Sequence, residues 1–433
     1  MQRARHFALP LGLALACAAQ AVAAEPVLSA EAQIERVLLD VRTWRRDIHQ
    51  HPELSNREVR TAKLVATHLA EQGYEVRTGV AHTGVIGVLR GGPGPVVALR
   101  ADMDALPVVE ETGLVFASRE RATYAGRDVG VMHACGHDAH TAILMGVAEV
   151  LAARRAELAG TVVLLFQPAE EGAPSGERGG AELMLEEGAF GSPRPDAVFG
   201  LHVTPELAVG RVGVRSGAAM ASSDRLTIRV KGRQSHAAYP WQGVDPIAAA
   251  ARIVLALEAL PARDVDARIP SVVSIGAFHG GVRHNILPGD VELLGTIRAL
   301  DTAQRTALHE KVRRTAEGMA QASGAEAEVE IDEGNPMVWN DPALLTRMRP
   351  ALERAAGAAQ VEDVLPWTAS EDFAFYQQQV PGVFFWLGVR PEGVAPADAT
   401  PLHTPRFVLD EAALPLGVRA MTEIAVSFLE SVR

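Results

Sequence analysis

The stretch PVVALRADMD, residues 95–104, runs from a proline through apolar and β-branched residues into two carboxylates. Short apolar runs of this kind, bounded by proline or glycine, are typical of strands buried on both faces of a sheet. TVVLLFQP (161–168) and DAVFGLHV (196–203) have the same character, and helical patterns lie between these runs at about 138–156 and 178–188. Because strands that alternate with helices form parallel sheets, we expect an α/β layered domain with a mostly parallel sheet.

The pattern changes from about residue 211 to strands in which apolar and polar residues alternate. The predicted elements that follow are RLTIRVKG, the helix DPIAAAARIVLALEAL, SVVSIGAF, DVELLGTIRAL, a helix over 302–322 and EAEVEID. Their order, β-α-β-β-α-β, is that of a ferredoxin-like unit. We therefore expect a catalytic domain over residues 25–210 and 333–433, interrupted by a ferredoxin-like α+β domain over residues 211–332.

Residues 1–24 have the features of a secretory signal peptide, because Arg3 and Arg5 precede a short apolar run that ends in small residues. We expect cleavage at the end of this run and a secreted, periplasmic protein. An uncleaved anchor and, because of Cys17, a lipoprotein are the alternatives. No later stretch approaches 18 uninterrupted apolar residues, so we expect no stable membrane insertion of the mature protein.

The mature chain is predicted to be acidic. Without residues 1–24 it has 39 Lys and Arg against 53 Asp and Glu, a net charge of −14. This charge disfavours binding to nucleic acid or to an anionic membrane surface. Cys135 is then the single cysteine, and a lone thiol in an oxidising compartment is a liability unless it is buried or bound to a metal.

Polar residues follow the predicted strands, where ligands bind in open α/β sheets. The candidates, from five separate segments, are Asp102, Cys135, His137, Glu170, Glu171, His202 and His403. Each one alone has an ordinary explanation, such as a helix cap or a surface histidine. Together they have the composition of a metal site.

A catalytic cysteine is the main chemical alternative, since Cys135 stands between His133 and His137. That interpretation leaves the glutamate pair and the distant histidines without a role, so we favour the metal site. A cation that polarises a carbonyl and activates water, with a glutamate to move the proton, suits amide hydrolysis. Glu170 and Glu171 fit such a division of labour, although their spacing does not decide which one binds the metal.

Eight motifs, in this order from about residue 36 to the end, carry a family resemblance: LRADMDALP, MHACGHDAHT, QPAEEG, GLHV, SHAAYPWQGVDPI, HNILPGD, SEDFAFY and LHTPRF. Together they resemble the dimetal aminoacylase and carboxypeptidase family, in the branch of hippurate hydrolase and the auxin-conjugate (IAA-amino acid) amidohydrolases. The resemblance implies a zinc-peptidase-like catalytic domain and hydrolysis of N-acyl amino acids, hippurate-like or similar acyl or aryl conjugates, by metal-activated water. A carbamoyl-amidohydrolase or peptidase of the wider family, and a non-catalytic ligand-binding homologue, are the alternatives.

The resemblance also implies roles for the candidate residues. It makes Glu170 the general base and gives five ligands to two divalent metal ions: Cys135 as a shared bridge, His137, Glu171, His202 and His403. Our hypothesis places Glu171 and His403 on one ion, and His137 and His202 on the other. Asp102 matches a carboxylate that orients a ligand. Thiolate and imidazole favour softer ions and carboxylates admit manganese, so zinc, manganese, cobalt and nickel all remain possible.

By resemblance, the inserted domain is a lid that also forms a homodimer. His236 matches a histidine that polarises the scissile carbonyl in the partner's active site, although its action in cis or in trans stays open here. Asn285 and Arg298 match positions that hold the substrate's carbonyl or carboxylate, and an arginine fork suits a carboxylate. HNILPGD and YPWQG depart from the family's usual forms, which puts the substrate preference in doubt.

Overall fold

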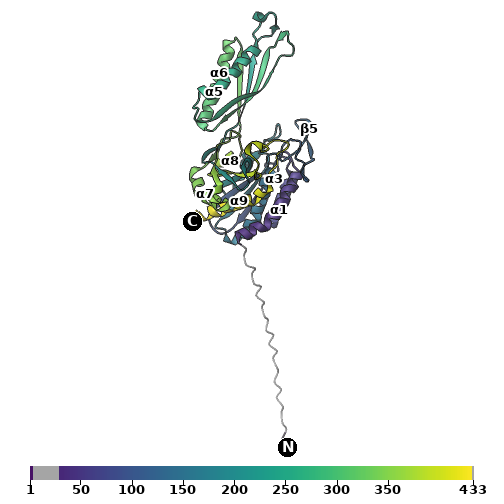
Figure 1. The fold of residues 1–433 in the computed structure, drawn as a ribbon, viewed down its shortest axis with the longest axis vertical. Coiled ribbons are helices and arrows are strands. Elements are labelled where there is room, and N and C mark those ends of the chain that lie inside the picture. The colour runs from purple at the N-terminus through teal and green to yellow at the C-terminus, as the bar shows by residue number, and fades with distance from the viewer. Residues whose placement is uncertain (3–28, 432–433) are drawn as a thin grey trace.

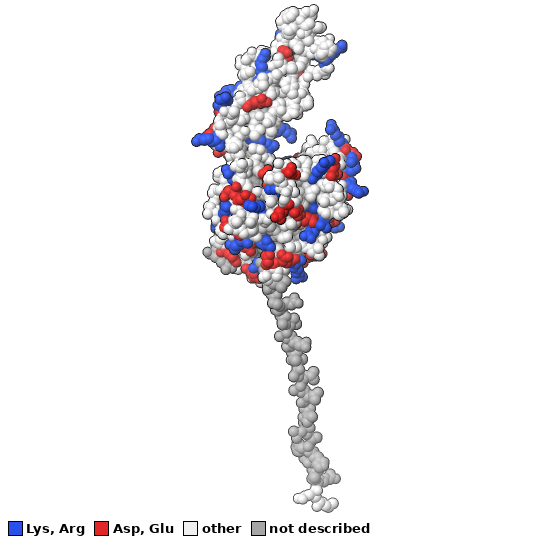
Figure 2. Space-filling view, in the orientation of Figure 1, with Lys and Arg blue, Asp and Glu red and all other residues white. Residues whose placement is uncertain are grey.

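The computed structural model describes residues 1–2 and 29–431, so residues 3–24 of the predicted signal peptide, with its cleavage site, lie outside the described residues. A larger body, formed by both ends of the described chain, carries a smaller one formed by its middle (Figure 1). Lys and Arg alternate with Asp and Glu over the visible face of the larger body (Figure 2). The predicted mixture of an α/β domain with an inserted α+β domain is confirmed.

An eight-stranded mixed sheet forms the centre of the larger body. In their order across the sheet, its strands are β1 (Glu75–Val80), β2 (Gly84–Arg90), β6 (Thr161–Gln167), β3 (Val96–Asp102), β7 (Ala197–Ala208), β18 (Gly382–Arg390), β8 (Val212–Val214) and β17 (Val361–Asp363). The neighbours β6, β3, β7 and β18 are parallel, as are β8 and β17. The pairs β1–β2, β2–β6 and β18–β8 are antiparallel, so the expected parallel arrangement holds at the centre of the sheet and not at its flanks.

Helices cover both faces of this sheet, which explains the continuous apolar strands. One face packs against α1 (Ala30–Gln50), α2 (Val59–Glu71), α3 (His137–Ala153), α7 (Pro342–Ala356) and α9 (Leu414–Ser431), and the other against α4 (Gly180–Glu186) and α8 (Ala374–Gln377). Successive residues of β3 enter opposite cores: Val97 and Leu99 join the first, and Ala98 the second.

One described helix, Glu411–Ser431, is long and apolar enough by composition to cross a membrane. Its most apolar window is 67% buried inside the protein, where α9 packs against α3 and α7. These contacts make it a core helix of the α/β domain.

The smaller body has ferredoxin-like topology, as predicted. Its elements are β10 (Asp224–Lys231), α5 (Pro246–Arg263), β12 (Ser271–Gly280), β14 (Asp290–Ala299), α6 (Thr302–Ala322) and β15 (Glu326–Glu333). The sheet order is β12-β14-β10-β15, with every pair antiparallel. Apolar residues of β10, α5 and α6, such as Leu226, Ile253 and Leu308, form its separate core.

Short strand pairs complete the fold. They are β4 (Arg121–Tyr124) with β5 (Arg127–Gly130), β9 (Gly217–Met220) with β16 (Val338–Asn340), and β11 (Ser235–His236) with β13 (Ile286–Leu287). Our prediction began the inserted domain at residue 211, whereas β8 pairs in the large sheet and β9 pairs with β16 of the catalytic domain. All three residues of β8 are buried, and Val212 and Val214 both join the core that contains α3 and α9, so this strand has the character of the catalytic domain and the smaller sheet begins only at Asp224.

Candidate metal centre

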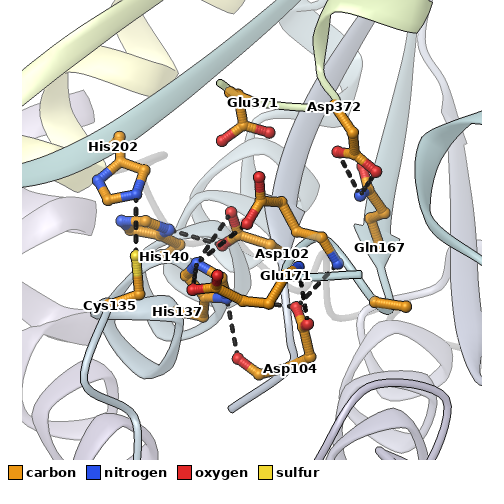
Figure 3. Close-up of polar contacts among 12 residues, drawn as sticks. Asp102, Asp104, Cys135, His137, His140, Gln167, Glu171, His202, Glu371 and Asp372 are labelled. Atoms are coloured by element: carbon orange, nitrogen blue, oxygen red, sulfur yellow. Dashed lines mark hydrogen bonds and ion pairs between the residues drawn. The ribbon is translucent and has the colours of Figure 1, made fainter. Parts of the chain in front are cut away.

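Four of the candidate ligands, Cys135, His137, Glu171 and His202, meet near the carboxyl ends of the parallel strands β3, β6 and β7 (Figure 3). Asp102 ends β3, Glu170 and Glu171 follow β6, and His202 lies in β7. Because parallel strands end at one edge of the sheet, this arrangement is the one expected from the sequence.

A tight turn and a backbone contact place the remaining candidates. Gly136 has φ 94° between Cys135 and the first residue of α3, and a Cβ at this position would lie 2.4 Å from Cγ2 of Val203. Glycine is therefore required where the chain turns sharply between the two candidate ligands. His403 reaches the same place because its backbone N–H donates to the carbonyl of Ala134 at 2.8 Å.

Cys135 is common to two groups of potential ligands. One group contains His137 and His202, the other contains Glu171 and His403, and the ligand atoms within each group lie within 4.8 Å of one another. The Sγ atom is 3.3 Å from Nε2 of His202 and 3.2 Å from Nε2 of His403. The Nε2 atom of His403 is also 3.2 Å from Oε1 of Glu171. This geometry matches two adjacent cation positions that share one sulfur.

The hydrogen bonds of the histidines leave lone pairs directed at these positions. Nδ1 of His137 donates to the carbonyl of Asp104 at 2.8 Å, and Nδ1 of His202 donates to the carbonyl of Val203 at 2.6 Å. Each Nε2 is then a free acceptor. Nε2 of His137 and Oε1 of Glu171 are buried and have no hydrogen-bond donor among the described residues. Buried acceptors without donors are costly, and divalent cations would satisfy them, so the residues fit a metal pair.

The protonation state of Cys135 argues against a free catalytic thiol. Burial, together with the charges of Glu171 and Glu170, raises the pKa of the thiol well above its ordinary value. A nucleophilic cysteine needs the opposite shift, which a helix N-terminus or a cationic partner supplies. Cys135 therefore fits the role of a metal ligand better than the role of the nucleophile in a Cys-His pair.

His140 has a supporting role instead of a ligand role. Its Nδ1 donates to Oδ1 of Asp102 at 2.6 Å, and its Nε2 accepts the backbone N–H of Val203 at 2.9 Å, so both ring nitrogens are used. Burial by itself would raise the pKa of Asp102, but His137, His140 and Arg100 around it hold that pKa well below its ordinary value. Asp102 is thus an anion that orients the imidazole ring of His140, and its Oδ2 lies 3.6 Å from Nε2 of His137.

Glu170 is the acidic group best placed to move a proton. Its side chain is 9% exposed, and Oε2 lies 3.9 Å from Nε2 of His137. Burial raises its pKa well above the ordinary value, and the charges of Glu371, Glu171 and Asp372 raise it further, against the opposing effect of Arg100. A raised pKa makes a carboxylate a stronger base near neutral pH.

Asp104 supports the glutamate pair, a role that the sequence did not reveal. Its carboxylate accepts the backbone N–H of Glu170 at 3.1 Å and of Glu171 at 3.0 Å, and the hydroxyl of Ser55 at 2.7 Å. Asp104 therefore fixes the turn after β6. The one sequence signal was a second carboxylate just beyond the end of β3.

A buried ion network behind Glu170 was also missed. Arg100 donates to Asp102 at 2.7 Å, to Glu371 at 2.9 Å and to Asp372 at 3.1 Å, and these four side chains are at most 7% exposed. Burial raises the pKa of Glu371 to about 8, although Arg100 lowers it. Glu371 and Asp372 come from the SEDFAFY motif, to which we had given no role.

Comparison with known proteins decides the family. Residues 98–427 match the peptidase family M20/M25/M40. N-acetylcysteine deacetylase from Bacillus subtilis is 41% identical over 391 residues, covering 90% of this chain and 97% of that protein. The chain belongs to the M20 family. The predicted resemblance is confirmed.

Other M20 relatives agree in sequence and in structure. IAA-amino acid hydrolase ILR1-like 4 from Arabidopsis thaliana is 38% identical, over 89% of this chain and 84% of that protein. A Bacillus subtilis structure described as a dinuclear metal-binding peptidase of the M20 family superimposes with a TM-score of 0.77 and 39% identity, covering 92% of this chain and all of that one. These findings confirm the expectation of a metal-dependent hydrolase that acts on amides, and the two overlapping ligand groups agree with two metal ions.

The predicted catalytic histidine of this M20 protein, His236, and the two predicted substrate-binding residues, Asn285 and Arg298, are divided between two places. Arg298 lines the cavity of about 420 Å³ that also contains Cys135 and Glu170, and its Nη1 donates to Ser370 at 2.9 Å. His236 and Asn285 do not line that cavity. They lie together in the inserted domain, where the N–H of Ala237 donates to the carbonyl of Asn285 at 3.1 Å and β11 pairs with β13.

Proposed function

We propose that this M20 protein hydrolyses the amide bond of N-acyl amino acids, releasing a carboxylic acid and a free amino acid. The observation that carries the proposal is the position of Cys135 in two ligand groups, with the unpaired acceptors of His137 and Glu171 beside Glu170. The M20 relatives named as an N-acetylcysteine deacetylase and an IAA-amino acid hydrolase support this substrate class.

In the proposed reaction, Glu170 removes a proton from water and later delivers it to the nitrogen of the leaving amine. Cys135, His137, Glu171, His202 and His403 would hold two divalent ions, which supply Lewis-acid polarisation of the carbonyl and lower the pKa of water. The backbone carbonyl of Asp104 keeps the His137 ring oriented throughout. Arg298 binds the carboxylate of the amino acid, for which its planar guanidinium is suited.

The first test is a panel of N-acyl amino acids assayed with and without a chelator. The variant Glu170→Gln should keep its metal content, because Glu170 is not a proposed ligand, while turnover falls by about 10² or more. Glu182→Gln removes a nearby surface carboxylate with 54% side-chain exposure and should leave turnover unchanged. An active Glu170→Gln enzyme would remove Glu170 from the mechanism.

The same panel separates the alternatives. N-carbamoyl amino acids, and short peptides whose C-terminal residue can be removed, test the wider M20 activities. The peptides are included because thermostable carboxypeptidase 1 from Saccharolobus solfataricus is 38% identical to this chain. If every amide in the panel is inert in metal-loaded protein, the remaining interpretation is a ligand-binding homologue.

The inserted domain supports a proposed homodimer in which His236 and Asn285 serve the partner's active site. His236 is exposed, and large apolar side chains around β11 and β13 face solvent: Tyr239 (49%), Trp241 (73%), Val282 (97%) and Ile286 (37%). Solvent-exposed apolar groups of this kind mark an interaction surface. A partner subunit would cover them and would bring its own His236 to the metal centre.

Mixing two inactive variants tests this arrangement. In a heterodimer of His236→Ala and Glu170→Gln chains, one active site combines an intact Glu170 with an intact His236 if the histidine acts in trans. Activity should then return on mixing, to about half of the wild-type activity per heterodimer and about a quarter in an equal mixture, and light scattering should show a dimer. If mixing restores nothing and the protein is monomeric, His236 has no role in trans.

The proposed location is the periplasm, after cleavage of residues 1–24. The proposal rests on the arginines and the apolar run of that segment, with small residues at its end. Fractionation of expressing cells, followed by intact mass of the purified protein, gives the location and the new N-terminus together. A cytoplasmic chain of full mass would overturn it.

A further inference from the structure

Two buried basic side chains of α1, Arg45 and His49, lie near the metal centre. Each residue is 1% exposed, and neither lines the cavity that contains the candidate ligands. Because they stand four positions apart in the helix, they lie on the same face of it. Buried groups of this kind are costly without partners of opposite charge. Their partners connect them to the segments that carry Cys135, His137 and His403.

The first partner is Asp138, which stands next to His137 in the first turn of α3. The helix α1 packs beside α3 (Figure 1). Nε of Arg45 and Nδ1 of His49 each lie 2.8 Å from Oδ2 of Asp138, whose side chain is fully buried. Successive residues of an α-helix are rotated by about 100° around its axis. A fixed Asp138 therefore fixes the rotation of the helical turn that presents His137.

The other ring nitrogen of His49 binds a segment that contacts the His403 loop. Nε2 of His49 lies 3.2 Å from Oε1 of Glu110, whose side chain is also buried. The backbone N–H of the next residue, Glu111, donates to the carbonyl of Pro405 at 2.7 Å. Pro405 stands two positions after His403. The imidazole ring of His49 therefore links the start of α3 to the loop that carries the most exposed candidate ligand.

The charges of this group balance. Burial lowers the pKa of His49, and Arg45 lowers it further, but the carboxylates of Asp138 and Glu110 outweigh both effects and raise this pKa above its ordinary value. Nη1 of Arg45 donates to a third carboxylate, that of Glu411 just before α9, at 3.4 Å. Two cations on one face of α1 thus hold three anionic side chains from three separate segments.

A site for two cations needs its ligands at a fixed spacing, and Cys135, His137 and His403 lie outside the strands of the sheet. We propose that Arg45 and His49 are positioning residues of the metal centre. They set the spacing between the start of α3 and the His403 loop, and hence the fit of these ligands to two divalent ions. The inference holds whichever amide the enzyme cleaves, because it concerns metal binding.

Arg45 and Arg46 form a matched pair for the first test. Both guanidinium groups lie 5.1 Å from the centre of the Phe116 ring and both bond Glu411, but of the two only Arg45 is paired with Asp138. Zinc affinity is measured by competition with a chelator. Arg45→Met should weaken it by about 10-fold or more, the loss typical of residues that support metal ligands. Arg46→Met should stay within about twofold of the wild type.

Two amide side chains separate the two contacts of His49. Asparagine places its amide N–H near the position of Nδ1, and glutamine reaches the position of Nε2. His49→Asn should therefore keep the contact with Asp138, and His49→Gln the contact with Glu110. Anomalous diffraction from crystals grown with limiting zinc gives the occupancy of each metal position. Occupancy should fall mainly beside His403 in His49→Asn, and mainly beside His137 in His49→Gln.

A purely structural role gives a different result. A variant that is only less stable melts at a lower temperature without metal, yet its folded molecules bind zinc with the wild-type Kd. Circular dichroism of the metal-free proteins shows which variants are folded, and if Arg45→Met is not, the two His49 variants decide. Wild-type zinc affinity in folded Arg45→Met, an equal loss in Arg46→Met, or wild-type occupancies in both His49 variants would overturn the proposal.

Discussion

Replacing Glu58 by Gln is expected to stabilise the protein at pH 8 and to have little effect at pH 5. The side chain of Glu58 is fully buried. Its Oε1 accepts the backbone N–H of Ala169 at 2.9 Å, and its Oε2 accepts the hydroxyl of Thr83 at 2.5 Å. Glutamine can keep both contacts, because its oxygen accepts from Ala169 and its amide donates to the Thr83 oxygen. The variant therefore copies the neutral form of the glutamic acid.

The magnitude follows from the pKa of Glu58. Burial raises this pKa to about 8, and the charge of Asp104 adds to the effect, while the hydrogen bonds from Thr83 and Ala169 oppose it. The folded state consequently binds more protons than the unfolded state between pH 4.5 and about 8, so the wild-type protein loses stability as the pH rises through this window. At about 1.4 kcal/mol per pKa unit, the advantage of Glu58→Gln should grow by about 3 kcal/mol from pH 5 to pH 8.

Thermal unfolding of both proteins at pH 5, 6, 7 and 8, with the same metal present, measures this advantage. Glu177→Gln is a control of opposite sign, because hydrogen bonds from Arg57 and Asn56 lower the pKa of Glu177 to about 2 and its loss cannot stabilise the protein at high pH. A Glu58→Gln protein that melts at or below the wild-type temperature at pH 8 would refute the reasoning.

Two further substitutions test the supports of the metal centre. Asp104→Asn places an amide against the N–H groups of Glu170 and Glu171, which should cost about 2–3 kcal/mol of stability and weaken metal affinity, measured by unfolding and by metal titration; unchanged affinity would separate Asp104 from the site. Arg100→Met leaves Asp102, Glu371 and Asp372 without their cation and should cost about 3–5 kcal/mol in chemical unfolding at pH 8, with a smaller loss at pH 5; a loss below 1 kcal/mol would mean that the carboxylates are neutral in the folded protein.

The parts of this structure that the sequence predicted are those set by local pattern. Apolar strands that end in carboxylates predicted both the parallel centre of the sheet and the edge where Asp102, Glu171 and His202 meet. Alternating strands predicted the ferredoxin-like order of the inserted domain. Each of these inferences needs only the sequence period and the rule that parallel strands share one functional edge.

The parts that were missed depend on contacts between distant segments. The buried Arg100 sits within a strand, and its partner Glu371 lies 271 positions away in the sequence. The contact that keeps His140 from acting as a ligand, a hydrogen bond from the backbone N–H of Val203 to its second ring nitrogen, also joins segments that lie 63 positions apart. The sequence also contains no pattern from which the position of His236 relative to the metal centre could be predicted.

Anomalous diffraction from crystals of the metal-loaded protein tests the central claim most directly. Our account predicts two peaks that share the Sγ atom of Cys135, one beside His137 and His202 and the other beside Glu171 and His403. A single peak, or a peak held by Asp102 and His140 in place of Cys135, would contradict it.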